Sequence, residues 1–211
     1  MLRQKSTFPV ILSALKKHYP DAHCALDHKN PFQLLIATIL SAQCTDERVN
    51  KVTPPLFKKY PDAKAMSEAD VLEIEKLIHS AGFYKNKAKN IKACCEILVR
   101  EHQNKIPPDL DALVKLPGVG RKTANVVLGN AFGISSGVVV DTHVTRLSKR
   151  FGWVKIDDAV KIEQILNQLC PQSDWIMLPH YLIFHGRAIC KARSPRCEDC
   201  FLLSSCPQRF L

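Results

Sequence analysis

Apolar residues recur at helical spacing along almost the whole chain. The longest apolar stretch, Phe32 to Ala42, predicts a helix that is buried on all sides, and it is far shorter than the roughly 20 residues that span a membrane. Residues that favour helix starts precede the apolar stretches, and Gly or Pro follows them. The predicted starts are Asn30-Pro31, Asp46, Ser67 with Asp70, Asp141 and Asp174, and the predicted stops are Gly82, Pro107-Pro108, Gly133, Gly152 and Pro171.

The pattern predicts an all-α fold of roughly ten short helices with no internal repeat. Only Val138 to Val140 resembles a strand, and it is too short to found a sheet. The loosest interior stretch, Gly133 to Gly137, is the predicted crossing between a middle helical domain and a C-terminal domain that holds a metal centre.

The apolar residues near the N-terminus predict a helix and not a secretion signal. Val10, Ile11, Ala14 and Leu15 sit at helical spacing, and Lys16-Lys17 follows where a small-residue cleavage site would be needed. This helix could pack on either domain.

The charge balance favours a polyanionic partner. Thirty Lys and Arg against twenty Asp and Glu give a formal net charge of +10, which suits nucleic acid or an anionic membrane surface. Charge alone does not separate the two, and the apolar content of 46% is enough to fill the core of a globular protein.

The nine cysteines form two groups. Cys24, Cys44, Cys94, Cys95 and Cys170 are scattered. The other four crowd at the C-terminus with the spacing C-x6-C-x2-C-x5-C, namely Cys190, Cys197, Cys200 and Cys206. An odd total and this crowding predict a reducing compartment, the cytoplasm or nucleoid, and a metal site. Because only one pair has the C-x2-C spacing, a four-thiolate iron–sulfur cluster is favoured over zinc.

A helix-hairpin-helix is predicted in the middle of the chain. Leu110 to Val114 reads as a short helix, residues 116–120 as a tight turn with Gly118 and Gly120, and Arg121 to Leu128 as a second helix. Both glycines are expected to adopt conformations closed to other residues, and the amides at the helix start would seat a phosphate. An ordinary helix–helix turn is the alternative. A nucleotide-binding P-loop is excluded, because Arg121 interrupts the motif after a helix.

Two polar residues near the hairpin have candidate chemistry. Lys122 falls in the first turn of the second helix, where the helix dipole disfavours an ammonium ion, so its amine is a candidate nucleophile. Asp141 could accept a proton or stabilise positive charge that develops on a sugar. The alternatives are a phosphate contact for Lys122 and an N-cap for Asp141, on a helix from Thr142 to Arg150. Capping and catalysis are compatible for Asp141.

These elements, taken together and in this order, resemble the endonuclease III family of helix-hairpin-helix DNA glycosylases. The matching motifs are Leu-Pro-Gly-Val-Gly-Arg-Lys-Thr-Ala at residues 116–124, Val-Asp-Thr-His at residues 140–143 and the cysteine tail. The resemblance covers essentially the whole chain. It implies a six-helix barrel domain at residues 24–134, a [4Fe-4S] cluster domain at residues 1–23 and 135–211, and a cleft between them that holds Lys122 and Asp141.

The resemblance also implies an activity and a partner. The family removes oxidised or ring-damaged pyrimidines, which are flipped out of the duplex, and cuts the strand by β-elimination. The expected partner is double-stranded DNA with damaged bases or abasic sites, bound by a monomer, with no membrane partner. The expected DNA contacts are Gly118, Gly120, Arg121, His143, Lys191, Arg193 and Arg196, with Gln43 filling the gap left by the flipped base and Phe83 wedging the stack.

Two departures from the family pattern stand out. Phe83 occupies the wedge position where leucine is expected, and the Ile134 to Val139 connection is about one residue longer than expected. Three rival functions stay open: an adenine mismatch glycosylase, whose family has a residue other than lysine at position 122; a thymine mismatch glycosylase; and a non-catalytic hairpin module with structural zinc.

Overall fold

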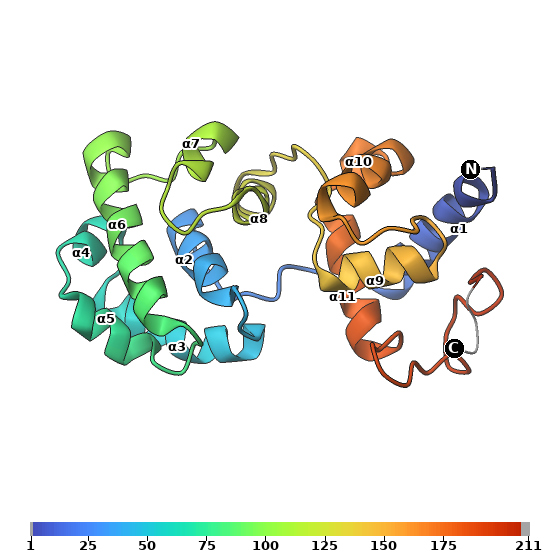
Figure 1. Cartoon of the computed structure of the whole chain (residues 1–211), viewed down its shortest axis with the longest axis horizontal. Helices are drawn as coiled ribbons and strands as arrows, with labels where there is room; N and C mark the ends of the chain where they lie inside the picture. The colour runs from blue at the N-terminus through green and yellow to red at the C-terminus, as the bar shows by residue number, and fades with distance from the viewer. Residues whose placement is uncertain (1, 208–211) are drawn as a thin grey trace. The chain divides into compact units, whose positions relative to one another are not determined.

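Every regular element in the part of the chain that the structure describes is a helix (Figure 1). The computed structural model describes residues 2–207, with side chains from residue 7, so residue 1 and residues 208–211 of the predicted cluster domain lie outside it. The predicted all-α class is confirmed, and Val138 to Val140 forms no strand. The elements are α1 (Leu2–His18), α2 (Pro31–Ser41), α3 (Asp46–Lys59), α4 (Ala63–Ser67), α5 (Val71–Ile78), α6 (Tyr84–His102), α7 (Leu110–Val114), α8 (Arg121–Phe132), α9 (Thr142–Arg150), α10 (Ala159–Leu169), the 3₁₀ helix η1 (Gln172–Asp174) and α11 (Met177–Ala188).

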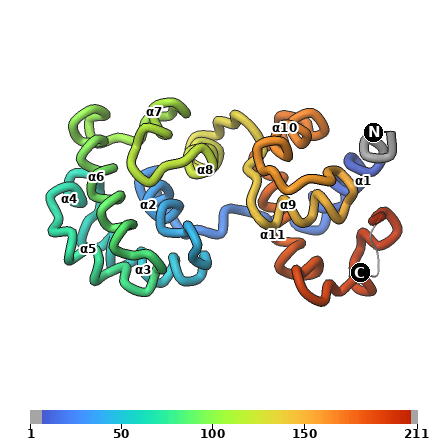
Figure 2. Tube along the Cα trace, in the orientation of Figure 1, coloured from blue at the N-terminus to red at the C-terminus, as the bar shows by residue number. Residues whose placement is uncertain are grey.

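The chain divides into two compact units (Figure 2). Residues 24–134, here called the middle unit, contain α2 to α8. Residues 1–23 and 135–211, here called the terminal unit, contain α1, α9, α10, η1 and α11. Each unit has its own cluster of buried apolar side chains, so each has a core of its own.

Helix α2 forms the centre of the middle unit. Phe32 and residues 34–40 are buried, and α2 packs against α3, α6 and α8. The start predicted at Asn30-Pro31 is confirmed, because the Asn30 side chain accepts a hydrogen bond from the Gln33 N–H at 2.9 Å. The apolar stretch is therefore a core helix.

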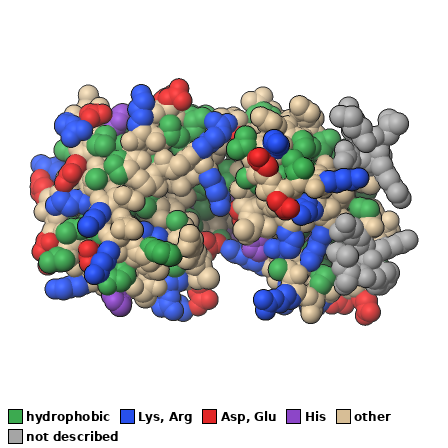
Figure 3. Space-filling model, viewed as in Figure 1, with side chains coloured by type: hydrophobic (Ala, Val, Ile, Leu, Met, Phe, Trp, Pro, Cys, Tyr) green, Lys and Arg blue, Asp and Glu red, His purple; other side chains and the backbone are tan. Residues whose placement is uncertain are grey.

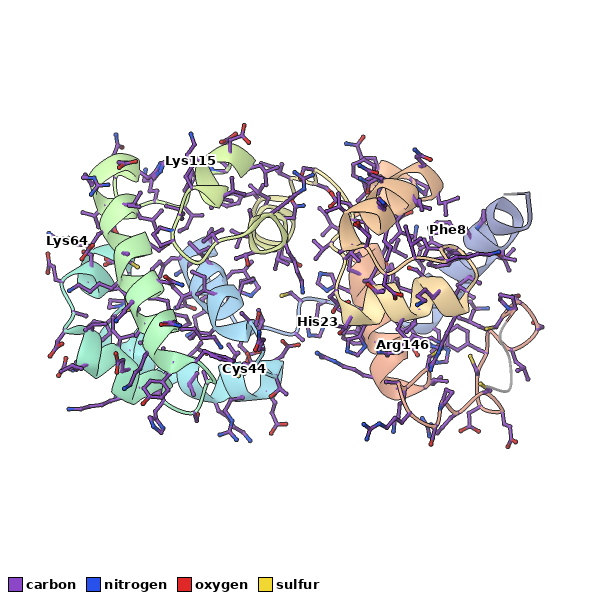
Figure 4. All side chains as sticks on the ribbon, viewed as in Figure 1. Phe8, His23, Cys44, Lys64, Lys115 and Arg146 are labelled. Carbon is purple, nitrogen blue, oxygen red and sulfur yellow. The ribbon has the colours of Figure 1, made fainter. Side chains whose placement is uncertain are left out.

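Helix α1 packs in the terminal unit, against α11. Its buried stripe contains Phe8, Ile11 and Leu15, and the ring of Phe8 lies 4.6 Å from that of Trp153 (Figure 4). Val10, which was expected on the apolar face, is 53% exposed. That expectation was wrong because the stripe runs through residues three and four apart, starting at Phe8.

Several predicted helix ends differ from the structure by a few residues. Helix α3 begins at Asp46, but its N-cap is Thr45. Asp70 caps α5, whereas Ser67 is the last residue of α4. Asp174 ends a 3₁₀ helix, and α11 begins only at Met177. These differences are typical of boundaries inferred from single residues.

The surface carries basic side chains (Figure 3), and the described residues include no helix that could span a membrane. Within residues 2–207, no helix is both long enough and apolar enough to cross a membrane. On the face shown in Figure 3, Lys and Arg side chains occur on both units.

Candidate functional site

The helix-hairpin-helix is present in the middle unit. Helix α7 (Leu110–Val114) and helix α8 (Arg121–Phe132) contact each other, as the sequence predicted. Gly118 has a φ of +77°, and a side chain there would meet Cβ of Asn90 at 3.1 Å, so this position requires glycine.

Gly120 contributes differently from the prediction. Its φ is −86°, which other residues adopt readily, so the expectation of a glycine-only conformation was wrong here. Gly120 is the N-cap of α8, and because glycine has no side chain, the first amides of the helix have no side-chain cap. A Cβ would meet nothing within 4 Å. Gly120 is exposed, and a helix start without a side-chain cap suits an anion such as a phosphate.

Lys122 is the second residue of α8 and is exposed, as is Arg121. The opposite side of the helix is fixed in the core, because Ala124, Val127 and Leu128 are buried and α8 packs on α2. The amine of Lys122 is thus carried on a helix anchored in the core and is exposed to solvent.

Asp141 is the N-cap of α9 in the terminal unit. Its carboxylate accepts a hydrogen bond from the Val144 N–H at 2.8 Å, so the predicted N-cap role is confirmed. The segment of chain that precedes Asp141 is held in place by a hydrogen bond from the Val138 N–H to the side-chain oxygen of Asn167, at 2.9 Å. A Cβ at Gly137 would press on the side-chain ends of Glu163 and Asn167, lying 2.9 Å from Nδ2 of Asn167, so both side chains would have to shift. Asp141 and Lys122 belong to different units.

Arg146 links the helix of Asp141 to the cysteine loop. Its Nη2 lies 3.2 Å from Nδ1 of His143 and donates to the carbonyls of Gly186 and Cys190, each at 3.2 Å (Figure 4). A Cβ at Gly186 would lie 2.7 Å from Nδ1 of His143, so glycine lets α9 and α11 approach closely. His143, expected to contact DNA, is half-buried at this junction.

Arg150 holds the start of the cysteine loop. Its Nη1 donates to the Lys191 carbonyl at 2.7 Å and lies 3.2 Å from Sγ of Cys190, and its Nη2 donates to the Ala192 carbonyl at 3.2 Å. A guanidinium has several donors in a fixed plane, so one side chain can hold three consecutive residues of an irregular loop.

The four C-terminal cysteines line one cavity. Cys190, Cys197, Cys200 and Cys206 border it together with Arg150 and His185. Within residues 2–207, no three His, Cys, Asp or Glu side chains lie close enough together to bind one metal ion. The four thiols are therefore spaced around a cavity and are too far apart to form a site for a single ion. Four thiols around one space, with a cation beside Cys190, are a donor set that fits an iron–sulfur cluster.

His185, one of the residues that line the cysteine cavity, is fully buried. Its Nδ1 is 3.0 Å from the Tyr19 hydroxyl, and its Nε2 is 3.6 Å from Sγ of Cys200. Burial, with a smaller contribution from His18, lowers the pKa of His185 to about 4. A neutral imidazole has one ring nitrogen that donates and one that accepts, so His185 can bridge the Tyr19 hydroxyl and the Cys200 sulfur.

The cations of the cysteine loop have unequal surroundings. Lys191 and Arg193 are exposed. Arg196 is also exposed, but its guanidinium donates to the Ala188 carbonyl at 2.8 Å and lies 3.7 Å from Asp199. Arg196 therefore helps to hold the loop, whereas Lys191 and Arg193 present their charges to solvent.

Gln43 and Phe83 lie in neighbouring loops of the middle unit. Both have left-handed backbones, with φ of 53° and 59°, and a Cβ at Gly82 would lie 3.8 Å from the Gln43 carbonyl. Phe83 is 66% exposed, which is unusual for a large apolar side chain. The structure thus brings the two predicted duplex-inserting residues together.

Two family models match the chain. The model of the HhH-GPD superfamily of base excision DNA repair proteins matches residues 36–172, and that of the iron–sulfur binding domain of endonuclease III matches residues 190–206. The chain is 56% identical over 207 residues to endonuclease III of Synechocystis sp., covering 98% of this chain and 94% of that protein. It is 41% identical over 196 residues to endonuclease III of Escherichia coli K12, covering 93% and 92%.

Solved structures give the same picture. A trapped covalent intermediate of an endonuclease III with DNA superposes with a TM-score of 0.91 at 47% identity, covering 97% of this chain and 96% of that one. A thermostable thymine-DNA glycosylase has a TM-score of 0.86 at 22% identity, covering 96% of each chain. The second likeness is one of fold alone.

Proposed function

Because this chain belongs to the endonuclease III family of base excision DNA repair proteins, we propose that the amine of Lys122 and the carboxylate of Asp141 are its catalytic pair. The enzyme is a DNA glycosylase with AP lyase activity that acts on damaged duplex DNA. Its proposed substrates are oxidised or ring-damaged pyrimidines. The observation that carries the proposal is the exposed amine of Lys122 in the first turn of a helix that no side chain caps at Gly120.

The proposed reaction proceeds in two stages. The lone pair of the Lys122 amine attacks C1′ of the extruded nucleotide as the amine gives up a proton, a C–N bond forms, and the base leaves with the electrons of the glycosidic bond. Sugar-ring opening then gives a Schiff base between Lys122 and C1′. Loss of a C2′ proton and departure of the 3′ phosphate cut the strand, and water releases the enzyme.

Support for the nucleophile comes from accessibility and from a relative. Lys122 is exposed in the first turn of α8, where amides without a side-chain cap can hold the neighbouring phosphate. The 47% identical endonuclease III of the solved complex was trapped as a covalent intermediate with DNA. A covalent intermediate needs a nucleophile, and Lys122 is the candidate in this chain.

Asp141 is proposed to act on the sugar and on the proton of the amine. A carboxylate opposite C1′ stabilises the positive charge that develops as the base leaves, and it can accept the proton that the attacking amine loses. The hydrogen bond from the Val144 N–H orients this carboxylate. One of its oxygens thus serves as the cap, and the other is the proposed catalytic oxygen.

The remaining expected DNA contacts divide by type. Gly118, Gly120 and Arg121 are proposed to hold a phosphate at the hairpin, and Lys191 and Arg193 to contact the backbone from the cysteine loop. Gln43 is proposed to fill the gap in the duplex and Phe83 to wedge the stack. His143 and Arg196 are kept as contacts of lesser weight, because both already bind other groups of the protein.

The enzyme carries a [4Fe-4S] cluster in its iron–sulfur binding domain. We propose Cys190, Cys197, Cys200 and Cys206 as the ligands, since these four thiols line one cavity. These thiolates would hold the iron atoms of the cluster, and a bound cluster would fasten the loop at the four cysteines. Arg150 and His185 stand beside the sulfurs of Cys190 and Cys200. Because thiolates survive in a reducing compartment, the proposed location is the bacterial cytoplasm, at the nucleoid.

A panel of duplexes tests the proposed function. The duplexes carry a pyrimidine glycol, a T·G mismatch, an A·G mismatch, an abasic site or no lesion, and products are resolved before and after alkali. We expect cleavage of the glycol and abasic duplexes without alkali. Excision that needs alkali, or that is confined to one mismatch, would assign a mismatch glycosylase, and binding without excision would assign a hairpin module.

The double variant Lys191→Ala/Arg193→Ala is expected to weaken DNA binding for all sequences alike. If both side chains contact phosphates, the slope of log K against log salt should fall by about 1.8, at about 0.9 per contact. Titration of an undamaged duplex across salt concentrations measures this slope. Arg196 stays unchanged because it holds the loop. Lys161→Ala, an exposed lysine on α10, is the control for charge, and an unaltered slope in the double variant would make the loop a bystander.

A further inference from the structure

Lys87 is a buried lysine of α6 whose ammonium binds a backbone carbonyl. Its exposed fraction is 6%, and its Nζ donates to the Leu40 carbonyl at 2.8 Å. Burial lowers the pKa of Lys87, while the nearby thiol of Cys44 acts in the opposite direction. A cation buried against a neutral carbonyl costs free energy that an apolar side chain of similar length would not cost.

The carbonyl that Lys87 binds lies in the last turn of α2. The last four carbonyls of a helix lack partners within it. In α2 the Thr38 carbonyl accepts from the Ser41 hydroxyl, and the Ser41 carbonyl accepts from the Cys44 N–H. The Leu40 carbonyl accepts from Lys87. Leu40 is fully buried, so Lys87 takes the place that water has at an exposed helix end.

Lys87 stands between the two loops that carry Gln43 and Phe83. Gln43 follows the Leu40 carbonyl by three residues. The backbone N–H of Lys87 donates to the Phe83 carbonyl at 3.1 Å, in the first turn of α6, and Phe83 caps this helix without a side-chain hydrogen bond. One residue is therefore bonded to both segments, by its ammonium to the first and by its amide to the second.

Both loops need such support, because each has a residue in an unfavourable backbone conformation. Gln43 and Phe83 have φ of 53° and 59°. Residues other than glycine rarely adopt this left-handed backbone region. A residue held in this way keeps its direction only if the surrounding structure fixes it. Cys44, labelled in Figure 4, directly follows Gln43 in the loop between α2 and α3.

We propose that Lys87 is a positioning residue for base extrusion, which locks the Gln43 loop to the Phe83 loop so that both side chains enter the duplex as one rigid pair. The inference rests on the proposed function, in which these two side chains open the stack. Lys87 touches neither substrate nor reacting atoms. It acts through the Leu40 carbonyl and the start of α6.

The test compares Lys87→Met with a matched variant on the same helix, Lys92→Met. The ammonium of Lys92 also donates to a backbone carbonyl, that of Ala69, at 2.7 Å, but Ala69 belongs to neither loop. Methionine fills a space of similar length without charge. The two variants thus remove the same kind of bond, and only one of the bonds ties the loops.

Extrusion is followed with 2-aminopurine beside the lesion in stopped-flow fluorescence, and the melting temperature is measured in parallel. Lys87→Met is expected to slow the extrusion phase by about 10- to 100-fold, with a melting temperature lowered no more than that of Lys92→Met, because each variant leaves one backbone carbonyl without its lysine donor. Lys92→Met is expected to extrude at the unmodified rate. Lys87→Gln keeps a neutral donor, so its extrusion rate should lie between those of Lys87→Met and Lys92→Met. It replaces Lys87→Met in the test if that variant does not fold.

Two results would overturn the inference. If Lys87→Met extrudes as fast as the unmodified enzyme, or slows only in proportion to a lost melting temperature, Lys87 is merely a cap of α2. Gln43→Ala and Phe83→Ala separate this from failure of the function itself. If they are slow while Lys87→Met is normal, only the inference falls. If they extrude normally, the insertion roles and the inference fall together, while lesion cleavage is judged on its own.

Discussion

Replacing Lys122 by alanine is expected to abolish strand cleavage at a pyrimidine glycol and at an abasic site, with a loss of about 10³-fold or more in rate. Without the amine no C–N bond to C1′ can form, so no Schiff base precedes β-elimination. Single-turnover cleavage of end-labelled duplex measures the rate. Binding should weaken far less, because the amides at the start of α8 and Arg121 stay in place.

Two variants separate nucleophile from charge. Lys122→Arg keeps a cation at the same position but removes the amine nucleophile, so binding should be retained and cleavage lost. Lys115→Ala removes an equal charge from an exposed lysine of the same hairpin (Figure 4) and should cleave nearly normally. Efficient cleavage by Lys122→Arg would make Lys122 a phosphate contact and would require another nucleophile.

Replacing Asp141 by asparagine is expected to slow base release by about 10²- to 10⁴-fold, the range typical of a lost acid–base or charge-stabilising group. The affinity for lesion DNA should change little, because the substitution removes no cation. Stability should also be retained, since asparagine caps helices as well as aspartate does and can still accept from the Val144 N–H. Excision rate, dissociation constant and melting temperature are measured on one preparation.

Asp158 provides the matched control for Asp141. It caps α10 in the same unit, with its carboxylate accepting from the N–H groups of Val160 and Lys161 at 2.9 Å and 3.0 Å. Asp158→Asn should leave excision unchanged. If Asp141→Asn loses binding and excision equally, or resembles Asp158→Asn, Asp141 is a helix cap and nothing more.

Features coded by neighbouring residues could be predicted from the sequence. The buried helix at residues 31–41, the hairpin helix at residues 110–114 and the cap at Asp141 each depend on residues within one or two helical turns. The cysteine cavity also follows from local spacing. The backbone conformation of Gly120 does not, because φ at one position depends on the geometry of the whole turn, and here it is −86°.

Long-range contacts had no signal in the sequence. Arg146 reaches Gly186 and Cys190, which lie 40 and 44 residues away, and Tyr19 meets His185 across 166 residues. Each arginine or tyrosine looks like an ordinary helical residue until the packing of α9, α11 and α1 brings its partner near. The burial of Lys87 could not be predicted for the same reason, since its partner, the Leu40 carbonyl, lies 47 residues away. Lysines and arginines that recur along a helix indicate a solvent-exposed face far more often than a buried side chain bonded to another segment.

Borohydride reduction during turnover on a glycol-containing duplex, followed by peptide mass spectrometry of the adduct, tests the central claim most directly. Reduction converts a Schiff base into a stable C–N bond, so the modified peptide identifies the nucleophile. The account predicts a single adduct, on the side chain of Lys122. An adduct on another amine, or excision with no adduct at all, would contradict it.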